Sequence, residues 1–310
     1  MQVHRSINHL PEFKNAVVTI GTFDGVHTGH QEIIEHLKQE AKSINGETVL
    51  ITFHPHPRKI VSSKNIFILN TLFEKVELLE SKGIDHLVVV PFDENFAHQT
   101  PDEYVKNFLF EKIHPHTVII GYDHRFGRNR QGDYHLLENY GKQLGFVVKE
   151  IPEHLVHREI VSSTKIREAL LAGDITTANE YLGYDYFFEG IVAEGNKLGR
   201  VLGYPTANLA IEDKEKLIPG NGIYVVQCEI RNLKSQIRNG MMSIGVRPTI
   251  GISDRTIEVN IFDFDENIYG KILRVYVKQY LREEVKFNNL EELKEQLAKD
   301  KVDSLNILKN

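Results

Sequence analysis

Two histidines spaced three residues apart lie in the stretch GTFDGVHTGH, residues 21–30. A hydrophobic run over residues 16–20 precedes this stretch, and an amphipathic pattern over residues 30–43 follows it. A helix that starts after a strand offers unpaired N–H groups and a positive dipole end, which suit a phosphate group. The imidazoles of His27 and His30 could donate hydrogen bonds to phosphate oxygens and stabilise charge that develops in a transition state. We therefore predict a phosphate site at this turn.

The glycines of this turn match neither common phosphate-binding fingerprint, because the chain contains no GxGxxG and no GxxxxGK[ST] pattern. Gly21, Gly25 and Gly29 would instead let a ligand approach the backbone closely. The alternative is that His30 merely begins a helix and that His27 is an ordinary loop residue.

A second stretch, VSSTKIREAL over residues 161–170, has the pattern of a helix start. Ser162, Ser163 or Thr164 could cap this helix. Lys165 and Arg167 would lie in its first turn, where cations oppose the helix dipole. A bound anion would explain that arrangement, and an ordinary capped surface helix is the alternative.

The second half of the chain contains a glycine-rich stretch, GNKLGRVLGYPTANL, over residues 195–209. Gly195, Gly199 and Gly203 would form a phosphate-sized loop, Lys197 and Arg200 would add positive charge, and Pro205 would stiffen the exit. Thr206 and Asn208 lie two residues apart in an extended segment and therefore face the same side. A hydroxyl and an amide oxygen are hard ligands suited to Mg²⁺ beside ATP phosphates. The alternative is a glycine-rich hairpin with polar capping residues.

The elements that must position these residues divide the chain into two parts. Short apolar runs at 16–20, 48–53, 86–90, 117–121 and 146–150 alternate with helical patterns at 30–43, 71–82, 101–111 and 133–144. This alternation predicts βαβ units and a parallel sheet covered on both faces. After about residue 183, short β-rich runs punctuated by turn residues predict an antiparallel sheet or small barrel, followed by a helix near 289–299.

Composition narrows the class of protein. The 310 residues are 41% hydrophobic and 26% charged with a formal net charge of −6, so bulk charge does not indicate nucleic-acid binding. The presence of a single cysteine, Cys228, fits a reducing compartment. We expect Cys228 to be a small hydrophobic core residue in a strand. No signal-peptide pattern and no run of about 20 apolar residues is present, so we expect a cytoplasmic protein without a membrane partner. The sequence does not determine an oligomeric state, and a monomer is the default expectation.

HTGH (27–30) together with SSTKIR (162–167) resembles the nucleotidylyltransferase superfamily. The fuller set, GTFDGVHTGH, TFHPHPRKI (52–60) and GYDHRFGRNRQGD (121–133), resembles the FAD synthetase module of bacterial bifunctional riboflavin kinase/FAD synthetases. The glycine-rich stretch of the second half resembles the riboflavin kinase signature. GIYVV, SIGVRPT, IEVNIFDF, YGK and LREEVKF follow it in the family's order.

For the first half, the resemblance implies a Rossmann-like α/β nucleotidylyltransferase domain over residues 1–183. This domain would adenylylate FMN with ATP and release pyrophosphate. His27 and His30 would be its catalytic residues. Its ATP and phosphate contacts would come from Gly21, Phe23, Asp24, Gly25, His27, His30, Ser163, Thr164 and Arg167. Asp123, Phe126 and Gly127 would lie near FMN and adenine.

For the second half, the resemblance implies a six-stranded antiparallel barrel with a terminal helix, residues 184–310, that phosphorylates riboflavin with ATP. Glu258 would be the general base, Thr206 and Asn208 would hold Mg²⁺, and Arg282 would contact the flavin. ATP would be bound by Gly195, Lys197, Gly199, Arg200, Gly203, Pro205, Thr206 and Asn208. The small-molecule partners would be riboflavin, FMN and ATP, with Mg²⁺ as the cofactor.

Departures from the family pattern leave two alternative functions open. His54, His124, Arg247 and Asn260 replace residues that are common in the family, and Ile250 stands where phenylalanine is common. None of these changes removes a proposed catalytic group. One alternative is a riboflavin kinase whose first domain transfers nucleotides to another phosphate acceptor. The other is a flavin- or nucleotide-binding regulator, which the intact histidines and Glu258 disfavour.

Overall fold

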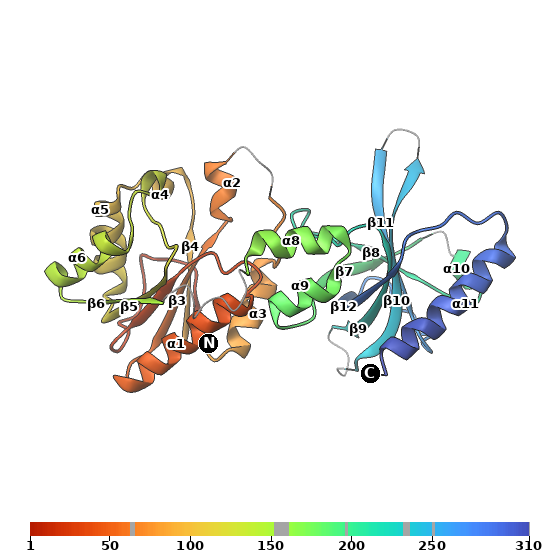
Figure 1. The fold of residues 1–310 in the computed structure, drawn as a ribbon, viewed down its shortest axis with the longest axis horizontal. Coiled ribbons are helices and arrows are strands. Elements are labelled where there is room, and N and C mark those ends of the chain that lie inside the picture. The colour runs from red at the N-terminus through yellow and green to blue at the C-terminus, as the bar shows by residue number, and fades with distance from the viewer. Residues whose placement is uncertain (63–65, 152–160, 196–197, 232–235, 250–251, 310) are drawn as a thin grey trace. The chain divides into compact units, whose positions relative to one another are not determined.

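The computed structural model describes residues 1–309 apart from 63–65, 152–160, 196–197, 232–235 and 250–251 (Figure 1). Contacts within the chain divide it into two compact units, Met1–Ser163 and Thr164–Asn310. Each unit contains one sheet with its own buried residues. The division by contacts groups residues 164–182 with the second unit. The functional boundary expected at 183–184 stays a prediction.

Six parallel strands form the sheet of the first unit, in the order β1-β4-β3-β2-β5-β6. They are β1 (Gln2–His4), β2 (Val17–Ile20), β3 (Thr48–His54), β4 (His86–Pro91), β5 (Thr117–Gly121) and β6 (Val147–Ile151). All four residues of β2 and most residues of β3, β4 and β5 are buried, as expected for strands covered on both faces. The five expected strands are confirmed. The edge strand β1 was missed because its three half-exposed residues carry no apolar run.

Helices cover both faces of this sheet (Figure 1). The main ones are α1 (Thr28–Ser43), α3 (Leu72–Ser81), α5 (Pro101–Glu103) continuing into the π-helical η1 (Tyr104–Ile113), and α6 (Tyr134–Leu144). Their bounds agree with the four expected helices. Short helices α2 (Pro57–Val61), α4 (Glu94–Ala97) and η2 (Arg128–Arg130) lie in the connections. The Thr71 side chain caps α3, and Gly83 and Gly145 follow helices with positive φ, as is common for glycines after a helix end.

The strand order places β2 at the centre of a doubly wound sheet. From β2 the chain continues to β3 and β4 on one side of the sheet and to β5 and β6 on the other. Ligands of such sheets bind beyond the carboxyl ends of the strands where the order reverses, which here is between β2 and β5. Because β2 and β5 are paired neighbours, the loops that follow them begin side by side.

The second unit contains a closed barrel of six antiparallel strands in the order β10-β11-β8-β7-β12-β9. The strands are β7 (Phe187–Ala193), β8 (Ala207–Ala210), β9 (Gly222–Ile230), β10 (Arg238–Thr249), β11 (Ile252–Ile261) and β12 (Ile272–Arg282). This confirms the fold expected for the second half. The short helix α10 (Leu198–Val201) was not expected, and it interrupts the glycine-rich loop between β7 and β8.

Three longer helices accompany the barrel: α8 (Ser163–Ala172), α9 (Ile175–Leu182) and α11 (Leu290–Ile307). Asn179 of α9 donates from Nδ2 to the Val277 carbonyl of β12 at 2.9 Å. The Gly220 N–H donates to the Leu170 carbonyl of α8 at 2.9 Å. The terminal helix α11, expected near 289–299, extends to Ile307 and contacts β10 of the barrel (Figure 1).

Candidate active sites

The loop between β2 and α1 is held in place by the buried side chain of Asp24. Asp24 Oδ1 accepts hydrogen bonds from the Leu69 N–H at 2.9 Å and the Asn70 N–H at 3.3 Å. Ser163 Oγ donates to the Asp24 carbonyl at 2.9 Å, which ties the serine of the second motif to this loop. Phe23 is also buried. Burial gives Phe23 and Asp24 a supporting role, and their direct contact with ATP stays a prediction.

The two histidines of HTGH meet at the amino end of α1. His27 is the N-cap residue, and its Nδ1 accepts a hydrogen bond from the His30 N–H at 3.4 Å. The two rings stack with centroids 3.7 Å apart and an interplanar angle of 19°. Because Nδ1 of His27 accepts, the proton of the neutral ring lies on Nε2, where it could be donated to an anion. The positive end of the α1 dipole also favours an anion at this position.

His30 lies deeper in this site and packs against the Phe23 ring, with centroids 4.8 Å apart. Burial lowers the pKa of His30 well below its ordinary value, and the charges of His27 and Lys75 lower it further. Its Nδ1 is buried and has no hydrogen-bond partner in the part of the chain that the structure describes. An orphaned polar atom of this kind at a helix start is typical of a ligand contact.

The loop after β5 carries the residues expected near FMN and adenine. Phe126 is buried and stacks on the Tyr104 ring, with centroids 5.0 Å apart. Gly127 has a φ of +71°, and a Cβ there would lie 2.8 Å from the Pro101 nitrogen, so only glycine fits. The Asp123 side chain is exposed at the carboxyl edge of the sheet, beside Gly121. The sheet thus places this loop next to the histidine loop, as the motifs required.

Thr164 and Arg167 lie on α8, which belongs to the second unit apart from its first residue. Ser163 is the residue of that motif that the structure links to the histidine loop. A contact of Thr164 or Arg167 with the same phosphates stays a prediction.

The barrel brings together the proposed base and the proposed metal ligands. Glu258 of β11 is the cross-strand partner of Asn208 of β8. Thr206 Oγ1 donates to Glu258 Oε2 at 3.1 Å. Ile257 and Val259 on either side of Glu258 are buried in the barrel, so the carboxylate projects from the outer face. A hydroxyl, an amide and a carboxylate side chain therefore lie close together at one point of the β8–β11 pair.

The glycine-rich loop closes over this point. A Cβ on Gly195 would lie 2.1 Å from Nδ2 of Asn208, and one on Gly199 would lie 2.3 Å from the Tyr204 carbonyl oxygen. Gly203 has a φ of +84°. Gly199 needs glycine because its backbone approaches the Tyr204 carbonyl too closely for a side chain, and Gly203 favours glycine because of its positive φ. Arg200 is exposed on α10, Pro205 is exposed at the loop exit, and Lys197 lies outside the described residues.

Arg282, expected to contact the flavin, is paired with a buried carboxylate. Its Nε donates to Asp300 Oδ1 at 2.9 Å and its second terminal nitrogen to Asp300 Oδ2 at 2.6 Å. Asp300 is 1% exposed and also accepts from Gln296 Nε2 at 2.8 Å. This bidentate pair fastens α11 to the end of β12. A contact between Arg282 and flavin stays a prediction.

Asp300→Asn is expected to lower the free energy of unfolding of the barrel by about 3 kcal/mol, because it leaves the Arg282 guanidinium without its buried counter-charge. Urea unfolding, followed through the loss of FMN-forming activity, measures the change. Asp303→Asn, the same substitution one turn further along α11, is the matched control and should leave the midpoint nearly unchanged. Equal shifts in the two variants would contradict the structural role of the pair.

Lys75 is a residue of the first site that the sequence motifs did not reveal. It lies on α3 and is only 6% exposed, and its Nζ donates to the Thr22 carbonyl at 2.7 Å. The available signal was its position: Lys75 and Leu79 are four residues apart and share the apolar face of an amphipathic helix. A lysine on that face is unusual because its charge must be buried.

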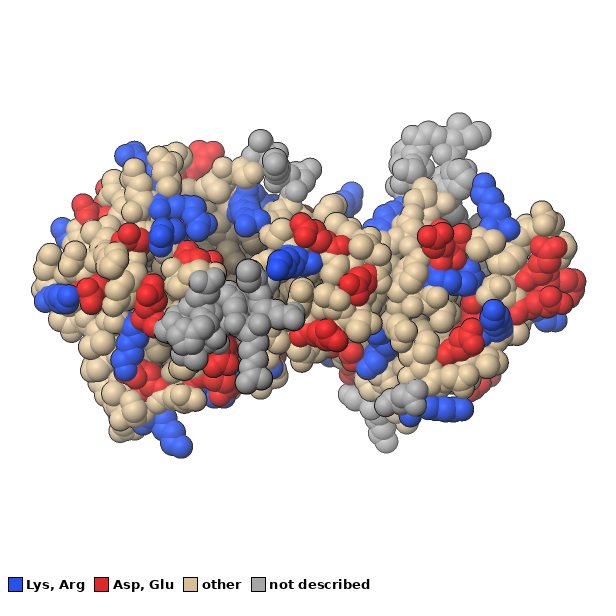
Figure 2. All heavy atoms as spheres, viewed as in Figure 1, with Lys and Arg blue, Asp and Glu red and all other residues tan. Residues whose placement is uncertain are grey.

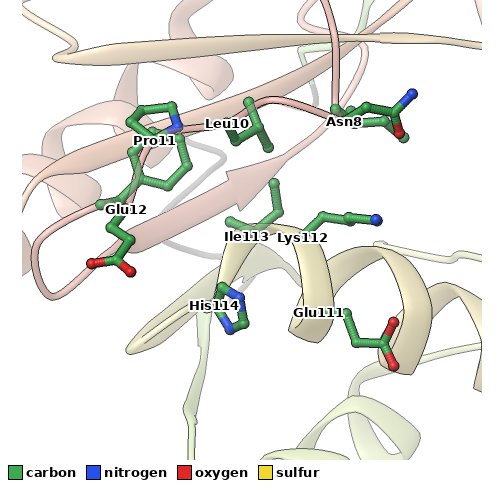
Figure 3. Close-up of a pocket in the computed structure, with 10 residues that line it drawn as sticks. Asn8, Leu10, Pro11, Glu12, Glu111, Lys112, Ile113 and His114 are labelled. Carbon is green, nitrogen blue, oxygen red and sulfur yellow. The ribbon is translucent and has the colours of Figure 1, made fainter.

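A cavity of about 530 Å³ lies elsewhere in the first unit (Figure 3). It is lined by residues 7, 8, 10–13 and 111–114, and the side chains of Glu12, Glu111 and Lys112 surround it. Its lining segments precede β2 and β5, so it opens at the amino edge of the sheet, away from the motif loops. None of the expected site residues lines it.

Comparisons with known proteins identify a family for each half of the chain. A family model described as FAD synthetase matches residues 10–165, and one described as riboflavin kinase matches residues 182–308. A protein from Haemophilus influenzae described as bifunctional riboflavin kinase/FMN adenylyltransferase is 36% identical over 302 residues, covering 97% of each chain. A protein of the same description from Buchnera aphidicola subsp. Schizaphis graminum is 38% identical and covers 97% of this chain and 96% of its own length.

This chain belongs to the bifunctional riboflavin kinase/FMN adenylyltransferase family. A solved structure from Streptococcus pneumoniae, named as a macrolide-efflux protein, has a TM-score of 0.88, 30% sequence identity and 98% coverage of both chains. The architecture found here is therefore shared along the full length with an experimentally determined structure.

Three further observations concern membrane-spanning helices, surface charge and metal-binding groups. Among the described residues, no helix is long and apolar enough to cross a membrane. On the face drawn in Figure 2, lysine and arginine side chains and aspartate and glutamate side chains both occur on each unit. The part of the chain that the structure describes also holds no group of three or more His, Cys, Asp or Glu suited to a metal ion.

The departures from the family pattern fall in different environments. Asn260 donates from Nδ2 to the Pro205 carbonyl at 2.7 Å, so it supports the exit of the glycine-rich loop. Burial lowers the pKa of His124 to about 4, and its buried Nε2 has no partner within the described residues. His54 is exposed at the end of β3. The Arg247 side chain and Ile250 lie outside the described set.

Proposed function

We propose that this chain converts riboflavin to FMN in the barrel and FMN to FAD in the α/β unit, with ATP as the second substrate in both reactions. The observation that carries the proposal is that both motif sets occur on units with the folds expected for them, with the His27–His30 pair at the start of α1 and Thr206 bonded to Glu258 on the barrel. Relatives named for both activities match almost the whole chain, which favours this function over a single activity or a regulator. The expected cytoplasmic location and monomeric state stay predictions.

In the α/β unit, a phosphate oxygen of FMN would attack the α-phosphorus of ATP. A P–O bond to FMN forms, the bond to the β-phosphate breaks, and pyrophosphate leaves. His27 and His30 would donate hydrogen bonds to phosphate oxygens as negative charge builds there, aided by the amino end of α1. The loop after β5 would hold the acceptor in line with ATP.

In the barrel, the 5′-hydroxyl of riboflavin would attack the γ-phosphorus of ATP. Glu258 would accept the hydroxyl proton as the new P–O bond forms and ADP leaves. The hydrogen bond from Thr206 orients the Glu258 carboxylate. Gly195 and Gly199 let the loop backbone approach the phosphates, where N–H groups could bind them.

The residues beside Glu258 fit a magnesium ion, because a hydroxyl and an amide oxygen lie on the same side of β8, next to a carboxylate. When bound, Mg²⁺ would neutralise charge on the ATP phosphates. Thr206→Val should therefore raise the Mg²⁺ concentration for half-maximal FMN formation about tenfold.

A magnesium titration of each half-reaction measures this effect. The Mg²⁺ requirement of FAD formation from FMN should not change, and Thr176→Val, on the exposed face of α9, is the matched control. An unchanged Mg²⁺ requirement for FMN formation in a folded Thr206→Val protein would remove Thr206 from the proposed metal site.

The experiment that tests the proposed function is a chromatographic time course of the purified chain with riboflavin, ATP and Mg²⁺. FMN should rise first and then convert to FAD. If FMN accumulates and no FAD forms even from supplied FMN, the α/β unit serves another acceptor or only binds nucleotide. If neither product forms, the proposed function is wrong.

A further inference from the structure

A buried lysine lies behind the loop that carries the two histidines. Lys75 Nζ donates to the Thr22 carbonyl at 2.7 Å and lies 3.5 Å from Thr52 Oγ1. Thr52 Oγ1 itself donates to the Thr22 carbonyl at 3.0 Å. The Thr22 carbonyl therefore receives bonds from both α3 and β3, which fixes the start of the loop that leads to His27.

The charge of Lys75 is only partly balanced by the protein. Burial lowers the pKa of Lys75, and the charge of Asp24 partly opposes that effect. Both direct partners of Nζ are neutral oxygens, and no carboxylate among the described residues forms an ion pair with it. Asp24 already accepts two backbone N–H bonds at the other side of the loop. A buried cation with neutral partners makes its surroundings favourable for an anion.

We propose that Lys75 is a positioning residue of the adenylyl-transfer site, which fixes the Thr22 carbonyl and supplies buried positive charge behind the triphosphate-binding loop. This inference rests on the proposed function of that loop. Lys75 acts through the loop and through His30, not by contact with the reacting atoms. It thereby couples α3, an element outside the sequence motifs, to adenylyl transfer.

The effect of Lys75 on His30 gives the proposal a signature that a purely structural lysine would lack. Three influences lower the pKa of His30: its burial, the charge of His27 and the charge of Lys75 on α3. Asp24, in the histidine loop, raises the pKa of Lys75 in turn. A positive charge disfavours the imidazolium, so Lys75 adds to the larger effect of burial and to that of His27 in lowering the pKa of His30. Removing that charge should raise the pKa of His30 towards its ordinary value.

Three variants separate the charge of Lys75 from its hydrogen bonds. Lys75→Met removes both, and Lys75→Gln removes the charge but keeps a donor for the Thr22 carbonyl. Lys75→Arg keeps the charge. We expect Lys75→Met to lower kcat for FAD formation about a hundredfold, the cost of a misplaced reacting group. In Lys75→Met and Lys75→Gln, the acid limb of the pH–rate profile that reports the ionisation of His30 should move to higher pH, because the pKa of His30 rises when the positive charge is removed. In Lys75→Arg the limb should stay in place.

A direct measurement separates this inference from the proposed function. An NMR titration of histidine-labelled full-length protein, with the His30 signal identified by its absence in His30→Ala, should show a higher His30 pKa in Lys75→Met and Lys75→Gln than in wild type. Lys38→Met, the same change at a half-exposed position of α1, should leave both the titration and FAD formation unchanged. Circular dichroism confirms that each variant is folded.

If the His30 titration and the acid limb stay in place in a folded Lys75→Met or Lys75→Gln protein, the inference is wrong, whatever happens to the rate. If wild-type protein makes no FAD but its His30 titration still depends on Lys75, the assigned reaction fails and the electrostatic coupling stands. FMN formation by the barrel serves as the internal standard for active protein concentration in every variant.

Discussion

His30→Ala is expected to lower FAD formation from FMN about 10²- to 10³-fold and to leave FMN formation from riboflavin unchanged. The substitution removes an imidazole that stacks on His27 and carries a buried Nδ1 without a partner within the described residues. Because that ring is proposed to meet the triphosphate as charge develops, the loss should fall mainly on kcat. Separate assays of the two half-reactions, each started from its own flavin, measure the effect.

His36→Ala is the matched control, because His36 lies on the same helix and pairs with Glu32 at the surface. That variant should retain both activities. Loss of both half-reactions in a folded His30→Ala protein would contradict the assignment of two separate sites.

Glu258→Gln should have the opposite selectivity. It keeps the size of the side chain but cannot accept the riboflavin proton, so FMN formation should fall about 10³-fold, within the range of general-base catalysis. FAD formation from supplied FMN should survive. Glu266→Gln, at an exposed position of the same unit, should leave FMN formation unchanged.

The pH dependence of the remaining activity gives a second test of Glu258. If the carboxylate is the base, the acid limb of wild-type FMN formation should be absent from the residual rate of Glu258→Gln. A variant that retains more than about a tenth of the wild-type rate at neutral pH would exclude Glu258 as the base, because loss of a true base costs more than that.

Most of the fold could be predicted because its signals are local. Strands β2 to β5 are buried on both faces, so each is a continuous apolar run that is visible in the sequence. Helix α3 begins with a capping box at Thr71 and Glu74, and α6 ends at a left-handed glycine. The three-residue strand β1 has no comparable signal and gains its identity from pairing with β4.

The histidine loop was also predictable, because a strand, a glycine turn and a helix start are contiguous in the chain. What holds that loop was not, because its supports are distant in sequence. Asp24 is bonded to residues 45 and 46 positions away, and Lys75 reaches Thr22 across 53 positions. No local pattern pairs such residues, and they meet only when α3 packs on the sheet.

The second site shows the same limit more strongly. Thr206 and Glu258 are 52 positions apart, and composition alone would leave Glu258 as one more surface carboxylate. Only the resemblance to the family singled it out. The bond from Asn260 to the Pro205 carbonyl and the pairing of Arg282 with Asp300 are tertiary contacts that no spacing rule predicts.

The pairing of β8 with β11 has a consequence for how this chain can change. Glu258 stands opposite Asn208, and side chains alternate between the two faces of a strand. A one-residue insertion or deletion in β8 would turn Asn208 towards the barrel interior while every residue of the proposed site remained present. The register of β8 against β11 must therefore be kept for the proposed site to form. Changes in chain length are expected only in loops outside these two strands.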